Sequence, residues 1–132
     1  MRHHKVLAWE RRLKRLFDKV DDLLEDEFGG RFLLHPARPE RGATANKESD
    51  GLFNIGASFS AGFGSRLGKG YIIDVRMVTL DNVPEEIRND IHNAVIREVE
   101  YLLPRYFPGK HLTVKKDGSV FKITGDLGLG SL

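Results

Sequence analysis

Residues 62–70, GFGSRLGKG, are the stretch of the chain whose composition could most readily support chemistry. Its four glycines would let backbone N–H groups converge on an anion, and Arg66 and Lys69 would add positive charge. The hydroxyl of Ser65 could also donate a hydrogen bond to a bound oxyanion. The segment therefore predicts an anion-binding loop, with a flexible hairpin tip as the alternative.

The glycine segment does not match the established phosphate motifs. The P-loop pattern fails because Phe63 stands where its first glycine is required, and Gly70 where serine or threonine is required. The dinucleotide fingerprint fails because Leu67 replaces its third glycine. Both motifs also lead from a strand into a helix, whereas here we expect a strand to follow the loop. Any anion binding would therefore rest on local charge and backbone geometry.

A second polar segment, residues 35–50, carries further candidates for binding and catalysis. The two segments together supply six candidate ligand-binding residues: Arg38, Arg41, Asn46, Ser65, Arg66 and Lys69. If the segments meet, their cations form one anion-binding pocket; the alternative is a solvated loop. The weak catalytic candidates are His35 and Asp50, as base and orienting acid, with Ser65 as nucleophile. No nucleophile elbow or metal-ligand spacing is present, so we predict no metal and no cofactor.

Residues 5–28 read as one amphipathic helix, because apolar residues recur at alternating steps of three and four. This stripe predicts a helix that faces the core, with a coiled-coil dimer as the alternative. Basic residues crowd the first half of the helix and acidic residues the second, which opposes the helix dipole. The segregation suggests an acidic partner at the basic end or an antiparallel second copy; the alternative is a solvated face.

The remaining periodicities predict two hairpins and a second helix. Residues 52–63 and 71–80 alternate as half-buried strands, with Phe53 to Phe63 on one apolar face. Residues 82–103 form a helix capped by Asn82 and ended by Pro104. In the last hairpin an Asp117-Gly118 turn would pair Val114 with Phe121 and leave Lys122 on the solvent face. We therefore expect an α+β two-layer sandwich, a four-stranded antiparallel sheet with two helices on one face, in the order α-β-β-α-β-β.

The bulk composition sets the limits of a functional prediction. The 132 residues favour a single domain, 1–132, with a long polar loop at 31–51 and a flexible tail at 125–132. A net charge of only +2 does not indicate a dedicated nucleic-acid binder. The absence of cysteine, of a signal-peptide pattern and of a membrane-spanning segment predicts a cytoplasmic protein.

These observations favour a small non-enzymatic binding domain. It would recognise a phosphorylated metabolite or nucleic acid through loops 35–50 and 62–70. Two alternatives stay open. One is a homo-oligomeric structural or adaptor protein that dimerises through helix 5–28. The other is a small hydrolase or transferase that uses the same loops.

Overall fold

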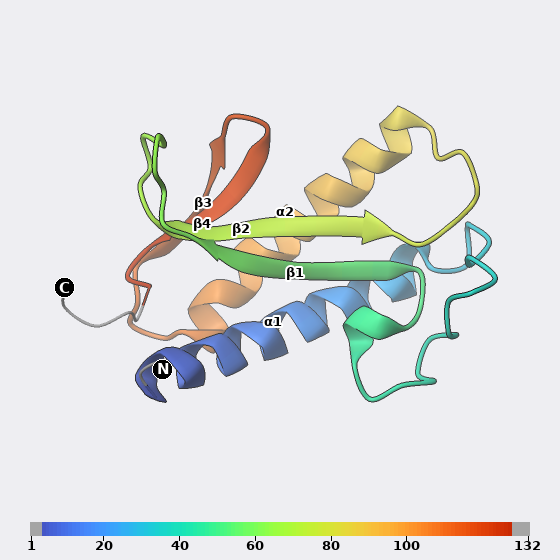
Figure 1. The fold of residues 1–132 in the computed structure, drawn as a ribbon, viewed down its shortest axis with the longest axis horizontal. Coiled ribbons are helices and arrows are strands. Elements are labelled where there is room, and N and C mark those ends of the chain that lie inside the picture. Colours follow the sequence, from blue (N-terminus) through green and yellow to red (C-terminus); the bar gives the residue numbers. More distant parts are fainter. Residues whose placement is uncertain (1–3, 128–132) are drawn as a thin grey trace.

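The computed structural model of the chain describes residues 4–127 and has the predicted α+β architecture (Figure 1). Its elements are α1 (His4–Phe28), the 3-10 helix η1 (Lys47–Ser49), β1 (Phe53–Ser60), β2 (Gly70–Met77), α2 (Glu85–Tyr106), β3 (Leu112–Asp117) and β4 (Val120–Gly125). The four strands form one antiparallel sheet in the order β1-β2-β4-β3. Both helices cover the same face of this sheet, and one hydrophobic cluster joins them to the strands.

The apolar stripe of α1 faces the core, as predicted. Trp9, Leu13, Leu16, Phe17 and Val20 are buried against the sheet and α2. This burial supplies most of the stability that an amphipathic helix gains from its surroundings. Because the stripe is used within the chain, it is not available to form a coiled-coil seam with a second copy.

The first hairpin keeps the predicted faces but is shorter than expected. Phe53 pairs with Met77 at one end of the hairpin, and Ser60 with Gly70 at the other. The prediction was wrong at the far end, where Phe63 lies beyond the strand and is 97% exposed. Phe59 is 42% exposed because it lies near the end of β1, at the open edge of the sheet.

The second helix begins and ends three residues later than predicted. No side chain caps its first turn; Pro84 occupies the N-cap position, so the predicted Asn82 cap is wrong. Pro104 does not end the helix either, because α2 continues through it to Tyr106. A proline in the last turn costs only one backbone hydrogen bond, and the Phe107 N–H still donates to the Leu103 carbonyl at 2.9 Å.

The last hairpin turns at Gly118 and Ser119, so the predicted register was wrong by two residues. Asp117 pairs with Val120, and Val114 pairs with Ile123 instead of Phe121. Gly118 has a φ of +63°, which the first central position of a type II′ turn requires. A shift of two residues leaves every side chain on its predicted face, because the side-chain period of a strand is two.

The C-terminal end of the described chain packs onto the core. Leu127 is buried, and the Asp126 N–H donates to the His111 carbonyl at 3.0 Å. Within the flexible tail predicted at 125–132, residues 126 and 127 thus have these hydrogen-bond and packing partners. Residues 128–132 lie outside the described part of the chain.

Candidate functional site

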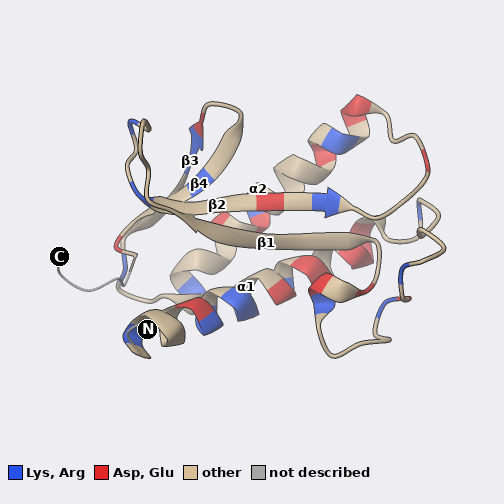
Figure 2. Cartoon of the chain, in the orientation of Figure 1, with Lys and Arg blue, Asp and Glu red and all other residues tan. Residues whose placement is uncertain are grey.

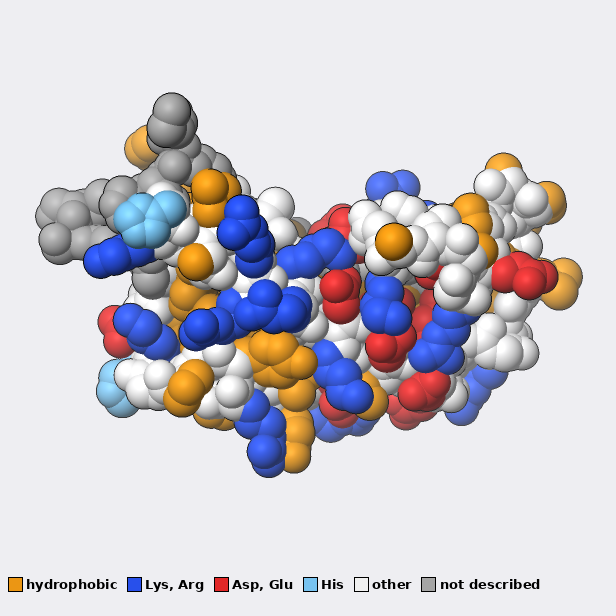
Figure 3. All heavy atoms as spheres, turned by 90° about the horizontal axis from the view of Figure 1, so that it is seen from below, with side chains coloured by type: hydrophobic (Ala, Val, Ile, Leu, Met, Phe, Trp, Pro, Cys, Tyr) orange, Lys and Arg blue, Asp and Glu red, His pale blue; other side chains and the backbone are white. Residues whose placement is uncertain are grey.

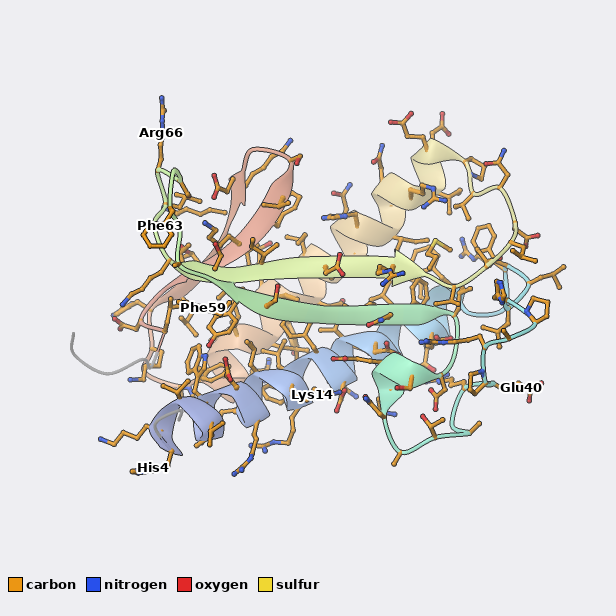
Figure 4. The ribbon with its side chains drawn as sticks, viewed as in Figure 1. His4, Lys14, Glu40, Phe59, Phe63 and Arg66 are labelled. Carbon is orange, nitrogen blue, oxygen red and sulfur yellow. The ribbon has the colours of Figure 1, made fainter. Side chains whose placement is uncertain are left out.

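The two loops predicted to form one pocket lie at opposite ends of β1. Residues 31–51 lead into its first residue, Phe53, whereas the glycine segment follows its last residue, Ser60. An eight-residue strand separates its ends by roughly 25 Å. Figure 4 shows Glu40 in one loop and Arg66 in the other at opposite ends of the molecule. The predicted common pocket does not exist.

Arg38 serves the fold rather than an open binding site. Its guanidinium donates hydrogen bonds to four backbone carbonyls, those of Glu48, Asp50, Gly51 and Phe53, at 2.6–3.2 Å. Five guanidinium N–H groups make arginine well suited to collecting several carbonyls at once. Arg38 therefore ties the polar loop to the start of β1.

The other polar-loop candidates are also engaged. Arg41 forms ion pairs with Asp22 and Asp26 at 3.3 and 2.9 Å, and Lys47 with Asp22 at 2.9 Å. Burial alone would raise the pKa of Asp22, but the hydrogen bonds from Lys47 and Arg41 outweigh it and lower that pKa. Asn46 accepts hydrogen bonds from the Glu48 N–H and from Lys14 Nζ, each at 3.1 Å.

A buried lysine holds the glycine hairpin in place. Lys122 is only 1% exposed, and its Nζ donates to Asp117 Oδ2, Ser65 Oγ and the Gly68 carbonyl at 2.8–3.1 Å. Lys122 lies on the predicted face of the sheet, but the glycine hairpin covers it there, so the prediction that it is exposed to solvent was wrong. The neighbouring strand carries Gly70 there, and a Cβ at Gly70 would collide with the Lys122 side chain. Lys122 pairs with Ile72 in the register, so its side chain reaches along the sheet over Gly70, and no signal in the sequence alone showed this contact.

Ser65 is a structural hydroxyl within this cluster. It donates to Asp117 Oδ2 at 2.6 Å and accepts hydrogen bonds from Lys122 and from the Leu67 N–H. The hydrogen bonds from Lys122 and Ser65 lower the pKa of Asp117. Of the predicted glycine-loop cations, Arg66 is exposed at the tip and points away from the body (Figure 4).

The three catalytic candidates do not assemble. Ser65 lies at the glycine hairpin, whereas His35 and Asp50 lie in the polar loop at the other end of β1. His35 Nδ1 accepts a hydrogen bond from the Ala37 N–H at 3.0 Å. Asp50 Oδ2 accepts from the Thr44 N–H and hydroxyl, and these bonds outweigh its burial and lower its pKa. Each candidate thus has a local structural partner, and no nucleophile–base pair is formed.

Unpaired positive charge gathers instead on the outer surface of α1. The residues that form it are Arg11, Arg12, Arg15 and Lys19, which we call the α1 basic face. All four are exposed, and no ion pair to them is recorded among residues 4–127. Arg12 lies over the Phe107 ring at 5.8 Å. Figures 2 and 3 show Lys and Arg gathered along the N-terminal half of α1, whereas both signs of charge mix beyond it.

The acidic half of α1 is either paired or buried. Asp22 and Asp26 receive the polar-loop cations described above. Glu25 is buried, and its Oε1 accepts a hydrogen bond from the Phe53 N–H at 3.0 Å. Asp21 is 3% exposed, with Oδ2 unpartnered. Its burial and the negative charge of Glu25 raise its pKa to about 8.

Comparison with known proteins assigns the chain to a protein family. A family model described as "Uncharacterised protein" matches residues 4–125. The chain belongs to this family. A Borreliella burgdorferi protein described as "Uncharacterized protein" is 42% identical over 106 residues, which cover 80% of this chain and 83% of the relative. No solved structure matches the chain. The family match runs from the first residue of α1 to the last of β4, so it covers every helix and strand of the described chain.

Two concavities of similar size flank the sheet. One, of about 400 Å³, lies between α1 and β1 and has Glu10, Lys14 and Glu48 in its lining. The other, of about 410 Å³, lies between β2 and α2 and has Arg76, Arg88 and His92 in its lining.

Within residues 4–127 no group of three or more acidic, histidine or cysteine side chains is placed to hold a metal ion. None of the described helices is long and apolar enough to cross a membrane.

Proposed function

We propose that this protein is a non-enzymatic binding domain that holds nucleic acid through the α1 basic face. The observation that carries the proposal is the contrast in pairing along one helix. The polar loop neutralises the acidic half of α1, whereas Arg11, Arg15 and Lys19 have no recorded ion-pair partner in the described chain. Positive charge left unpaired on one face is the electrostatic footprint of a polyanion partner.

The shape of the face favours an extended polyanion over a phosphorylated metabolite. Small ligands bind in concave sites that bury most of their surface, and the α1 basic face is the convex outside of a helix. Neither of the two concavities described above includes Arg11, Arg12, Arg15 or Lys19 in its lining. The four cations lie within nine residues, from Arg11 to Lys19, or roughly 12 Å of helix, which matches the length of several consecutive phosphates.

The chemistry of the face favours backbone recognition without sequence readout. Three of its four cations are arginines, whose planar guanidinium groups bind phosphate oxygens in a bidentate manner. No exposed aromatic side chain is part of the face, so base stacking does not contribute. Binding should therefore depend on salt and only weakly on sequence. A nucleic-acid ligand would also require the cytoplasmic location predicted from the sequence.

The experiment is a fluorescence anisotropy titration with labelled single-stranded RNA and duplex DNA of mixed sequence. The test variant is Arg11→Glu/Arg15→Glu/Lys19→Glu. The control is Lys110→Glu/Lys115→Glu/Lys116→Glu, which makes the same change in net charge at three exposed lysines on or beside β3. If each cation of the face contacts one phosphate, affinity should fall about 100-fold between about 50 and about 200 mM salt.

We expect the α1 variant to lose at least about tenfold in affinity and the control to keep most of it. Equal losses in the two variants would show a non-specific charge effect and would contradict the proposal. So would an absence of binding by the unmodified protein at low salt. Anionic lipid vesicles serve as a further arm, and we expect no binding, because the apolar side of α1 is buried and cannot insert.

A further inference from the structure

One part of β2 has a strand on only one of its two sides. β2 pairs with β1 along its whole length, but with β4 only through Tyr71, Ile72 and Ile73. The β3–β4 hairpin then diverges from β2, as Figure 1 shows. Residues 74–77 are therefore left with an open edge on the β4 side. The opening is internal to the sheet, between two strands that remain joined at one end.

The hydrogen-bonding pattern tells which backbone groups face this opening. The Val78 N–H donates to the Leu52 carbonyl at 2.7 Å, so even-numbered residues of β2 bond to β1. Because bonding directions alternate along a strand, the N–H and C=O groups of Val75 and Met77 point toward the opening. No backbone partner for these four groups is recorded among residues 4–127. The edge thus offers donors and acceptors in the spacing that an added strand uses.

The cavity of about 410 Å³ lies along this edge and is positively charged. Its apolar lining comes from Val75, Met77 and Ile91, and its polar lining includes Arg76, Arg88 and His92. No aspartate or glutamate contributes to the lining, in contrast to the cavity beside β1, which has two glutamates. An occupant with negative charge and some apolar surface would suit these walls.

Two side chains of α2 are held in place at this cavity. Arg88 Nε donates to the Val83 carbonyl at 3.3 Å, which orients the guanidinium while leaving its other N–H groups uncommitted. The His92 ring packs against Phe121 of β4, with centroids 5.1 Å apart, and its buried Nε2 has no hydrogen-bond partner. A buried polar atom without a partner is costly, and His92 carries this cost at the wall of the cavity.

We propose that this cavity binds a short, extended, acidic peptide segment of a partner protein, which adds as a strand beside Val75–Met77. A peptide matches both the donors and the acceptors of the open edge, whereas a small anion would match only the donors. Carboxylates on the peptide would bind Arg76 and Arg88, and its apolar side chains would contact Val75, Met77 and Ile91. The site is separate from the α1 basic face and does not depend on the function proposed above.

The probe is the blocked peptide Ac-Glu-Val-Glu-Val-Glu-NH₂, titrated into isotopically labelled protein and followed by backbone amide chemical shifts. Four comparison probes are the Lys-for-Glu peptide, glutarate, and two peptides that are N-methylated at one or the other set of alternate amides. Protein variants are Arg76→Ala/Arg88→Ala and, as control, Arg97→Ala, which removes an exposed arginine elsewhere on α2.

We expect the Val75 and Met77 amides to shift, the double variant to bind about tenfold more weakly, and the control to bind normally. One N-methylated peptide should lose binding and the other keep it, since only one edge of the peptide faces β2. The Arg11→Glu/Arg15→Glu/Lys19→Glu variant should bind the peptide normally. Equal binding by glutarate would show a small-anion site instead. Equal binding by the lysine peptide or by both N-methylated peptides, or no binding at all, would also overturn the proposal.

Discussion

The two halves of α1 carry opposite charges and have opposite roles. In the C-terminal half, Asp22 and Asp26 are paired with cations of the polar loop, and Asp21 and Glu25 are buried. On the N-terminal side of these acidic residues, from Arg11 to Lys19, the α1 basic face is exposed and has no ion pair within residues 4–127. The acidic half therefore belongs to the folding of the chain, and the basic half is available for binding. The number of charges does not distinguish these two roles. What distinguishes them is whether the charged side chains form ion pairs within the chain.

The helix dipole explains why the acidic half needs a partner. Acidic residues near a helix C-terminus face the negative end of the dipole, which destabilises them. Arg41 and Lys47 come from a loop 15 or more residues away in sequence and offset this effect. The α1 basic face begins at Arg11, more than one turn inside the helix, where the dipole has little effect on its cations.

The largest expected effect comes from releasing the loop that carries these cations. Replacing Arg38 by alanine removes its hydrogen bonds to four carbonyls and leaves half-buried acceptors without a donor. We expect a loss of about 3 kcal/mol in the free energy of unfolding, measured by urea denaturation. Arg38→Lys should recover little, because an ammonium group cannot reach four carbonyls in this arrangement.

The control for Arg38 is Arg66, which is exposed at the glycine hairpin tip. Arg66→Ala should change stability by less than about 0.5 kcal/mol. If the two alanine variants had similar stabilities, the polar loop would not be held by Arg38. The assignment of the acidic half of α1 to folding would then be weakened.

The second prediction concerns the buried carboxyl of Asp21. Its pKa is raised to about 8 in the folded protein, against about 3.8 for an ordinary aspartate. The folded state thus binds this proton more tightly than the unfolded state, so stability from this group is full below about pH 4. It is lost progressively as pH rises through 8. Asp21→Asn cannot ionise and should lose this dependence.

We therefore expect Asp21→Asn to be more stable than the unmodified protein by about 1–2 kcal/mol at pH 8, with the difference shrinking toward pH 4. Thermal unfolding across that pH range measures it. Asp26→Asn is the matched control, because Asp26 is exposed on the same half of the helix. A difference that stayed constant with pH would mean that Asp21 is ionised in the folded protein.

The fold was largely predictable from periodicity. A strand with one buried face has an apolar residue at every second position, and a helix with one buried face has one at every third or fourth position. The stripe of α1 and the alternation in β1 and β2 gave the correct elements and layers. The errors lie where local signals compete with tertiary contacts. The Asp117-Gly118 pair suggested a turn, but the Asp117 carboxylate bonds Lys122 and Ser65, and the chain turns one residue later.

The candidate site was harder to predict, because sequence does not say which cations are already engaged. Arg38, Arg41 and Arg66 look alike in a polar, glycine-containing segment. Only the structure separates a guanidinium with four carbonyl partners from one at an exposed hairpin tip. The charge segregation of α1 was visible from the start. Which half of α1 is left without ion pairs became clear only from the structure, in which Arg41 and Lys47 of the polar loop pair with the acidic half.

The smallest expected effect comes from removing the ion pairs that Arg41 forms with the acidic half of α1. Arg41 and its partners Asp22 and Asp26 are partly exposed, so solvent screens their attraction. We expect Arg41→Ala to cost about 0.5–1 kcal/mol in low salt and almost nothing in about 1 M salt. Arg15→Ala on the α1 basic face should cost nothing measurable in either condition, since it has no recorded partner to lose.

Because Arg41→Ala leaves Asp26 without its ion pair and Asp22 with only Lys47, it should weaken nucleic-acid binding slightly by adding uncompensated negative charge near the α1 basic face. Arg15→Ala should have the opposite effects, because its stability should be unchanged and its nucleic-acid affinity should clearly fall. If Arg15→Ala destabilised the protein as much as Arg41→Ala does, the N-terminal half of α1 would also serve the fold. The division between a folding half and a binding half would then be lost, and with it the main support for the proposed function.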